Sequence, residues 1–392
     1  MTTGCGCDEV SWRRMLSRRR QLQSGAAAAL GLVAASHFPL ESVAQDASPQ
    51  AAGRVAIAGA GPVVNGSFVH PLVEVYGDVR IGHRSFVASN TILYAAAERL
   101  VSLGDENNCQ DNAYVLARQR DVTFGDMVSI AHQAVIENST VGDFTFFGFR
   151  SRTRNAVVGA GAMIMHNTVV ENVTIPANRI TPLGARITTQ AAADALPELT
   201  EANDEFKHEV QEVNLEFVDG YSQISPHGPP DALEGIGPNP ITSWNPTAIA
   251  PQIGSGAVFA EFVRVVGDVR LGDDSRVGQR TALRADEGTP IVIGRHARIQ
   301  SRVTFHALKG TRVDVGDNAQ IGNGNVIHGP VRLGHNVTTE DDCVVFRAVV
   351  EDNVTIRAGA TIAGDFTLRQ GTIVPEGAVV TTQSEADALP AR

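Results

Sequence analysis

The chain has 392 residues and a formal net charge of −11 at pH 7. The net negative charge argues against nucleic acid as a partner, and the length is sufficient for two domains. No run of about 18 or more apolar residues is present, so the sequence predicts no membrane span once the leader described next is removed.

Residues 1–44 are predicted to be an export signal. Ser17-Arg18-Arg19-Arg20-Gln21-Leu22 resembles a twin-arginine motif, the apolar stretch Ala26–Ala35 follows, and Ser42-Val43-Ala44 offers a small-residue cleavage site. The alternative is an ordinary basic, amphipathic N-terminus. Export by the twin-arginine route predicts a periplasmic or extracellular protein of prokaryotic type.

Aliphatic or other apolar residues recur at every sixth position in two segments of the chain. The first segment begins with Val63, Val69, Val75, Ile81, Val87 and Leu93. The second begins with Ile253, Phe259, Val265, Leu271, Val277 and Leu283. Neither a helix nor an ordinary strand has this period, which is the hexapeptide signature of a parallel β-helix. The sequence therefore predicts a mainly β fold with two tandem parallel β-helix domains.

Other hexapeptide-repeat proteins wind as left-handed coils with three faces, so resemblance to them implies left-handed coils here. The first domain is expected at residues 53–221, ending in an α-helix at about 200–218 with Phe206, Val210, Val213 and Phe217 on one face. Residues 222–247 are rich in proline and predict an extended linker. The second domain is expected at residues 248–392.

After cleavage of the leader, two cysteines would remain. Cys109 occupies a core position of the period, where a small buried thiol is expected. Cys343 lies in the other copy at an unmatched repeat position, so no structural disulfide is predicted.

Three histidines are candidate metal ligands. His306 and His328 follow core residues one coil apart and, with Arg284, form a column on one corner of the second copy. A catalytic zinc needs three protein ligands and an open water position, so these two histidines need a third. His132, in the first copy, lies two residues after a core position and on a different face. Without further context, two solvated turn histidines would be the simpler interpretation.

The residues around these histidines resemble the γ-class carbonic anhydrases. The matching stretches are Arg284-Ala285-Asp286-Glu287-Gly288, Ile299-Gln300, His306-Ala307-Leu308, Asn325-Val326-Ile327-His328-Gly329-Pro330 and Ser129-Ile130-Ala131-His132-Gln133. In that family the metal lies between adjacent subunits of a trimer, with two histidines from one side and one from the other. The resemblance implies Zn²⁺ bound by His132, His306 and His328, with Fe²⁺ or Co²⁺ as other candidate ions.

The two copies have lost complementary parts of this site. The first has Tyr94, Leu116 and approximately Glu137 where the second has Arg284, His306 and His328. The second has Asn323 where the first has His132. Three ligands therefore meet only where the second copy's column faces His132.

The resemblance also implies roles for the remaining site residues. Zinc lowers the pKa of its water to near 7, and the resulting hydroxide attacks carbon dioxide. Gln300 and Asn214 would position hydroxide or bicarbonate. Arg284 and Asp286 would form an interface ion pair, a purely structural pair being the alternative, and Glu287 would move protons as an exposed carboxylate.

Two departures from the family pattern accompany these residues. Lys309 replaces a second shuttling carboxylate, which would slow proton export. Ser301 replaces the usual aspartate, which would loosen the interface.

The expected function is reversible hydration of carbon dioxide to bicarbonate at a composite site. The alternatives are a non-catalytic, γ-carbonic-anhydrase-like assembly protein and a hexapeptide acyltransferase. A homo-oligomer with threefold packing of β-helix domains is expected. The sequence leaves open whether the two halves of each site come from one chain or from two.

Overall fold

The computed structural model describes residues 66–227, residue 233 and residues 235–392. The predicted leader at residues 1–44 and the first expected core residue, Val63, lie outside these ranges. Across the described ranges, no helix combines the length and the apolar character needed to cross a membrane.

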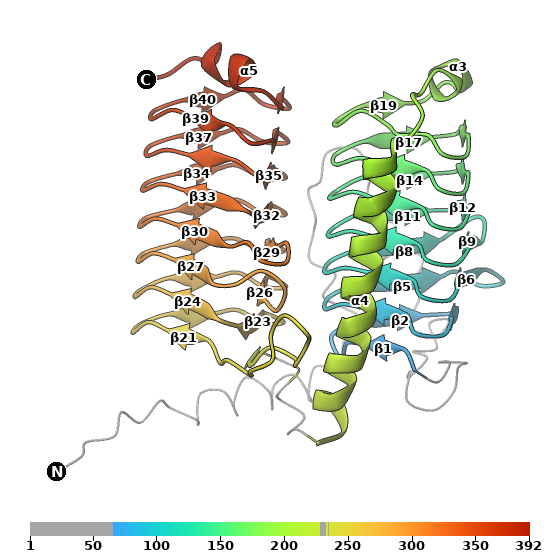
Figure 1. Ribbon diagram of the computed structural model, residues 1–392, viewed down its shortest axis with the longest axis horizontal. Coiled ribbons are helices and arrows are strands. Elements are labelled where there is room, and N and C mark those ends of the chain that lie inside the picture. The colour runs from blue at the N-terminus through green and yellow to red at the C-terminus, as the bar shows by residue number, and fades with distance from the viewer. Residues whose placement is uncertain (1–65, 228–232, 234) are drawn as a thin grey trace. The chain divides into compact units, whose positions relative to one another are not determined.

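The strands between residues 68 and 187 form three parallel sheets, called here the first stack (Figure 1). One sheet contains β1 (Phe68–Val69), β4 (Phe86–Val87), β7 (Asn108–Cys109), β10 (Ser129–Ile130), β13 (Phe146–Phe147) and β16 (Met163–Ile164). The next contains β2 (Glu74–Tyr76), β5 (Ile92–Ala95), β8 (Tyr114–Ala117), β11 (Val135–Glu137), β14 (Arg152–Arg154), β17 (Val169–Glu171) and β19 (Arg186–Ile187). The third contains β3 (Asp78–Ile81), β6 (Leu100–Leu103), β9 (Val122–Phe124), β12 (Thr140–Val141), β15 (Val157–Val158) and β18 (Thr174–Ile175).

The strands between residues 236 and 380 form three further parallel sheets, the second stack. One contains β20 (Ile236–Gly237), β23 (Arg264–Gly267), β26 (Ala282–Ala285), β29 (Thr304–Ala307), β32 (Val326–Gly329), β35 (Val344–Phe346), β38 (Thr361–Ala363) and β41 (Val379–Val380). The next contains β21 (Gln252–Ile253), β24 (Val269–Leu271), β27 (Ile291–Ile293), β30 (Val313–Val315), β33 (Val331–Leu333), β36 (Val349–Val350) and β39 (Thr367–Leu368). The third contains β22 (Val258–Phe259), β25 (Arg276–Val277), β28 (Arg298–Ile299), β31 (Gln320–Ile321), β34 (Thr338–Thr339), β37 (Thr355–Ile356) and β40 (Ile373–Val374).

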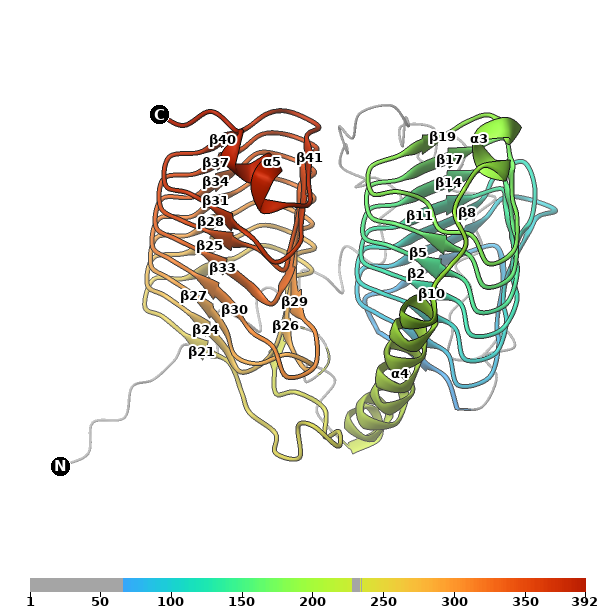
Figure 2. The same ribbon diagram turned by 45° about the horizontal axis from the view of Figure 1, so that its top comes forward.

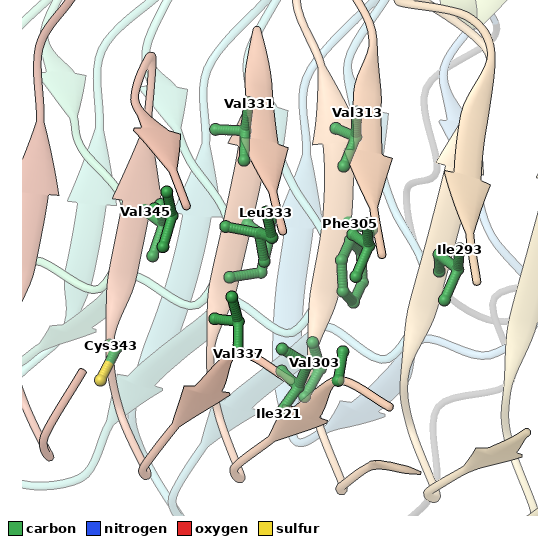
Figure 3. Packing of buried hydrophobic residues seen from close by; sticks show 14 of the residues in the cluster. Ile293, Val303, Phe305, Val313, Ile321, Val331, Leu333, Val337, Cys343 and Val345 are labelled. Atoms are coloured by element: carbon green, nitrogen blue, oxygen red, sulfur yellow. The ribbon is translucent and has the colours of Figure 1, made fainter. Parts of the chain in front are cut away.

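The period of six is explained by the interior of each stack. Core residues such as Val115, Ile130 and Phe305 are completely buried, and Figure 3 shows the inward packing around Phe305 and Ile321. Ile253, in the first coil of the second stack, is 36 % exposed because no coil precedes it in its sheet. The predicted parallel β-helix is therefore confirmed.

Glycine follows many core residues because successive coils approach closely at that corner. A Cβ added at Gly272 would lie 2.6 Å from the backbone nitrogen of Arg295 in the next coil. At Gly322 the corresponding distance to the carbonyl carbon of Glu340 is 2.5 Å. Real Cβ atoms do not approach backbone atoms this closely, so the aliphatic-glycine pair is required by coil spacing.

The two cysteines within the described residues are buried thiols. Cys109 is completely buried in the first stack, and Cys343, labelled in Figure 3, is completely buried in the second. Burial raises the pKa of each thiol to about 12, so neither is a thiolate at neutral pH.

The predicted helix is longer than the sequence pattern indicated. α4 spans Glu201–His227 and runs along the first stack (Figures 1 and 2). Lys207 Nζ donates to Gly161 O at 2.7 Å, and Gln211 Nε2 donates to Met127 O at 2.5 Å. The end predicted at about residue 218 is wrong because Tyr221 continues the buried helix face and packs against Phe68 of the first stack.

Two short helices follow the coils. α3 (Gln190–Asp194) and α5 (Gln383–Asp387) each have a threonine N-cap, Thr189 or Thr382, whose side chain accepts a backbone hydrogen bond. These are the matching tails of the two copies.

The proline-rich segment is only partly the extended linker that its composition predicts. Its first residues continue α4, and β20 pairs in parallel with β23 in the second stack. Asn239 and Asn245 are buried, and Asn239 Nδ2 donates to Pro240 O at 2.8 Å. Because internal hydrogen bonds and strand pairing hold residues 236–247, this part of the segment belongs to the folded structure.

His70 makes the stability of the fold dependent on pH. Its Nε2 atom donates to Leu233 O at 2.8 Å, and its Nδ1 atom accepts from Leu72 N at 3.1 Å, so the neutral ring is satisfied. Burial, assisted by Arg264, lowers the pKa of His70 from 6.5 to about 3. The unfolded chain therefore takes up a proton below pH 6.5 that the folded chain does not accept until about pH 3, and stability falls as pH falls through this window.

We expect the His70→Gln variant to lose less stability on acidification than the wild type, by about 2 kcal/mol between about pH 7.5 and pH 5. Urea unfolding at the two pH values measures the difference. The exposed His83, changed to glutamine, is the matched control and should keep the wild-type pH dependence. Equal losses in all three proteins would show that His70 is not held neutral.

A candidate metal centre

Three buried histidines converge on one point. His306 Nδ1 lies 3.3 Å from His132 Nε2 and 3.3 Å from His328 Nε2. Across the described ranges this is the one group of three histidine, cysteine or acidic residues whose ligand atoms all lie within 4.8 Å of one another. Each histidine is at most 3 % exposed.

The β-helix register places these side chains. β29 pairs with β32 so that His306 lies directly beside His328, in the column that the sequence predicts. His132 follows β10 of the first stack, whereas Leu116 and Glu137 pair on a different sheet of that stack. The structure therefore brings residues of both stacks of one chain together at the histidines.

The hydrogen-bond partners of the outward ring nitrogens show which ring nitrogens carry lone pairs. His306 Nε2 lies 3.1 Å from Asp286 Oδ1, and His328 Nδ1 lies 3.1 Å from Gly329 O. His132 Nδ1 lies 3.4 Å from Asp111 Oδ2, which is long for a hydrogen bond. Carbonyl and carboxylate oxygens only accept, so in neutral rings the outward nitrogens of His306 and His328 donate and the inward nitrogens carry lone pairs.

Burial keeps His132 and His328 neutral. It lowers the pKa of His132 to about 4, although Asp111 opposes the shift. It also lowers the pKa of His328 well below 6.5, with help from His306 and His132. Neutral imidazoles are the form that ligates a metal ion.

The donor set fits a tetrahedral cation. Zinc bound by histidine has Zn–N distances of about 2.0–2.1 Å, so two tetrahedral ligand nitrogens lie about 3.3 Å apart. The two nitrogen–nitrogen distances of 3.3 Å match this separation. The inward lone pairs of His306 and His328 at this spacing repel one another, and a shared cation would remove that repulsion.

Arg284 connects the histidines of the two stacks through two carboxylates. Its Nε atom lies 2.8 Å from Asp286 Oδ2, and its Nη1 atom lies 2.5 Å from Asp111 Oδ2. Burial alone would raise the pKa of both carboxyl groups, but Arg284 holds both well below their usual range. The ion pair expected between Arg284 and Asp286 is present, and Asp111 of the first stack is a further member.

Gln300 lies away from the histidines. It follows β28, in a different sheet from His306 and His328, and its side chain is exposed. The matching residue of the first copy, Gln110, is buried and occupies the site: Nε2 donates to Asn214 Oδ1 at 2.6 Å, and Oε1 accepts from Arg284 Nη1 at 3.2 Å. The assignment of Gln300 to the site is therefore wrong, because the face that carries His132 also carries Gln110.

The serine at position 301 is explained in the same way, because the first copy supplies the residue that the site uses. Asp111 stands at the matching position of the first copy and supplies the interface aspartate. Arg284 therefore has an aspartate partner in the first copy even though Ser301 stands in the second. The offset of 190 residues between the copies was the sequence signal for both Gln110 and Asp111.

Glu287 is buried, contrary to the expectation of an exposed carboxylate. It is 9 % exposed, its Oε1 atom accepts from Lys309 N at 2.8 Å, and its Oε2 atom lies 3.7 Å from His306 Nε2. Burial raises its pKa. The proline-rich segment packs beside it, because Trp244 Nε1 and Asn245 Nδ2 both donate to the backbone oxygen of Asp286.

The helix α4 supplies two residues to the site. Asn214 is buried and reaches it through the hydrogen bond from Gln110. The Tyr221 hydroxyl donates to Asp286 Oδ2, a contact that the sequence did not predict. The sequence signal for this contact is that Tyr221 lies two turns beyond Asn214, on the same helix face.

Comparison with known proteins places the chain among carbonic-anhydrase-like proteins. It is 31 % identical over 188 residues to the carbonic anhydrase of Methanosarcina thermophila, covering 42 % of this chain and 76 % of that protein. It is 33 % identical over 116 residues to gamma carbonic anhydrase 1, mitochondrial, of Arabidopsis thaliana, covering 26 % of this chain and 42 % of that protein.

A second group of relatives is named for assembly. The carboxysome assembly protein CcmM of Nostoc sp. is 33 % identical over 167 residues, which cover 40 % of this chain and 30 % of that protein. The chain spans 41 % and 28 % of the length of two further proteins of that name.

No family model matches the chain. With its parallel β-helix and its similarity to three quarters of a carbonic anhydrase, the chain belongs to the γ-class carbonic-anhydrase-like family of hexapeptide-repeat proteins.

Proposed function

We propose that the chain catalyses the reversible hydration of carbon dioxide to bicarbonate at a zinc centre between its two stacks. The observation that carries this proposal is the convergence of the buried His132, His306 and His328 at the spacing of tetrahedral zinc ligands. Three ligands leave a fourth position open, as in catalytic rather than structural zinc sites. A zinc ion there would act as a Lewis acid and lower the pKa of its water to near 7.

The chain's own residues would orient the reacting groups. Asp286 and Gly329 O fix the rings of His306 and His328 by accepting from their outward nitrogens. Gln110 is held by Arg284 and Asn214, so its amide is fixed at the join between the stacks. We assign to Gln110 the positioning role that the sequence predicts for Gln300, with Asn214 as its support.

Glu287 is suited to hold a proton. Its raised pKa moves a carboxyl group toward the working pH, which favours general acid–base transfer. Lys309 N fixes one of its oxygens, and the other lies 3.7 Å from His306 Nε2. Lys309 Nζ lies 5.1 Å from the centre of the Trp244 ring. Transfer of the proton from Glu287 to solvent would then depend on movement of these two side chains.

A non-catalytic assembly role is the second candidate. It is favoured by the relatives named carboxysome assembly protein, of which this chain spans less than half. Three residues stand where a histidine ligand is missing: Leu116 and Glu137 in the first stack and Asn323 in the second. In an assembly protein these positions would contribute only to subunit packing. We propose a homo-oligomer in either case.

The experiment that tests the function measures zinc content and carbon dioxide hydration on the purified chain. One zinc per chain with hydration above the zinc-free sample is expected. Bound zinc without hydration would favour the assembly role. No bound zinc, after dialysis against zinc at neutral pH, would contradict the proposed site itself.

The presence of Gln110 rather than Gln300 at the site gives a sharper prediction. We expect Gln110→Ala to lower kcat/KM for hydration by about 10- to 100-fold, the usual cost of removing a residue that supports a metal site. Gln300→Ala is the matched control and should retain the wild-type rate, since Gln300 is exposed on another sheet. The reverse result would restore the assignment of Gln300.

A further inference from the structure

Ion pairs connect the two stacks at three levels along the coils. Among the described residues, each of three pairs joins a residue of the first stack to one of the second: Glu74 with Arg280, Asp111 with Arg284, and Arg150 with Asp342. These six side chains are at most 19 % exposed. Water and salt screen such pairs less than pairs on the surface, so a wrong charge at any of these positions is costly.

Arg150 and Asp342 stand at matching positions of the two copies. Arg150 comes three residues after Phe147, the inward residue of β13, and Asp342 comes three residues after Thr339, the inward residue of β34. Both lie at a corner of the coil with positive φ, 57° and 66°, and Arg150 Nη2 lies 2.7 Å from Asp342 Oδ1. A join between two first stacks would therefore place arginine against arginine, and a join between two second stacks would place aspartate against aspartate.

The pair of Arg280 with Glu74 also depends on one stack of each kind. Arg264 is the residue of the second copy that matches Glu74, and Asn90 is the residue of the first copy that matches Arg280, both at an offset of 190 positions. Two second stacks would place Arg264 beside Arg280, so that like charges meet. Two first stacks would leave Glu74 beside an uncharged asparagine.

The pair of Arg284 with Asp111 follows the same pattern. Tyr94 matches Arg284, and Ser301 matches Asp111. Two first stacks would place Asp111 beside a tyrosine, and two second stacks would place Arg284 beside a serine. Either join would bury a charge without this partner, which is costly. Of the three possible joins, the one between unlike stacks is the only one that pairs all six charges.

The corner that carries Arg150 also opposes like stacks by its shape. Arg150 Nη1 donates to Gly324 O at 2.6 Å and to Gln133 Oε1 at 2.9 Å. Gly324 is the second copy's match of Gln133, since each comes three residues after the inward residue of its strand. A Cβ added at Gly324 would lie 2.9 Å from Arg150 Nη1. A first stack in the place of the second would therefore displace Arg150 as well as repel it.

We propose that these side chains make the join selective, so that a first stack accepts a second stack and each stack excludes another of its own kind. Opposite charges favour the right partner at an interface, and like charges act against the wrong one. The inference rests on the charges at matching positions and is independent of zinc and of hydration. Its consequence is that every join of this kind brings His132 of a first stack to His306 and His328 of a second.

The test uses the full chain without metal and compares reversal of a charge with its removal. Arg150→Asp gives the join the two aspartates of a pair of second stacks, whereas Arg150→Gln only removes the attraction. We expect Arg150→Asp to raise the equilibrium constant for unfolding in urea about 10-fold more than Arg150→Gln does. Arg80→Asp and Arg80→Gln are the matched control and should differ little, because Arg80 pairs with the exposed Asp78 within the first stack.

A charge swap completes the test. Asp342→Arg added to Arg150→Asp restores opposite charges in reversed order, and the double variant should recover the excess loss of Arg150→Asp over Arg150→Gln. Equal unfolding of Arg150→Asp and Arg150→Gln would overturn the proposal, as would a double variant no more stable than Arg150→Asp. If Arg150→Asp does not fold, a folded double variant would support the proposal, and failure of both to fold would overturn it.

Discussion

His132→Ala is expected to abolish carbon dioxide hydration and to weaken zinc binding by more than about 100-fold. The reason is that His132 supplies the third ligand, and changes to residues that only support metal ligands already cost roughly 10- to 100-fold in affinity. His306 Nδ1 and His328 Nε2 would remain 3.3 Å apart, but two imidazoles do not complete a tetrahedral site. Zinc content after dialysis and the hydration rate measure the two effects.

His83→Ala is the matched control for this experiment. His83 is an exposed histidine of the same stack, and its loss should change neither zinc content nor rate. If His132→Ala retains both zinc and hydration, the metal is not bound between the two stacks, and the proposed composite site is incorrect.

Arg284→Met is expected to lower the free energy of unfolding by about 3–5 kcal/mol, the usual cost of breaking a buried ion pair from one side. Its removal would leave Asp111 and Asp286, both completely buried, without the guanidinium that holds their charges. Because these two carboxylates belong to different stacks, the substitution weakens the contact between the stacks. Urea unfolding of the metal-free protein measures it.

Two comparisons make the Arg284 result interpretable. Arg80→Met removes an arginine whose partner is the exposed Asp78, and it should cost less than about 1 kcal/mol. Adding Asp111→Asn to Arg284→Met removes one of the stranded charges and should recover part of the loss. A cost for Arg284→Met as small as that for Arg80→Met would show that the network does not hold the stacks together.

The strands and the histidine column were predictable because both follow from one period. Six residues per strand and turn fix which side chain points inward, and Phe305 beside Ile327 in the register also places His306 beside His328. The pairing of Tyr94 with Leu116, and of Leu116 with Glu137, follows in the same way. These are local consequences of repeat length, which the sequence displays directly.

The errors arose where a residue's role depends on what packs against it. The residues around Gln300 in the second copy predict that it lines the site. The site instead uses the sheet of the first stack that carries His132, and therefore Gln110. Glu287 was expected to be exposed, but Trp244 and Asn245 of the proline-rich segment bind the backbone beside it. The composition of that segment predicts an extended chain and does not indicate where the chain packs.

The sequence by itself determined the parallel β-helix, the column of Arg284, His306 and His328, and the position of His132 in the other copy. Only the tertiary structure decided that one chain can supply both halves of the site and that Gln110 and Asp111 of the first stack contact Arg284 of the second. The physical reason is the range of the interactions. A repeat fixes contacts between successive coils, whereas contacts between the stacks join residues more than 170 positions apart, for which the period carries no information.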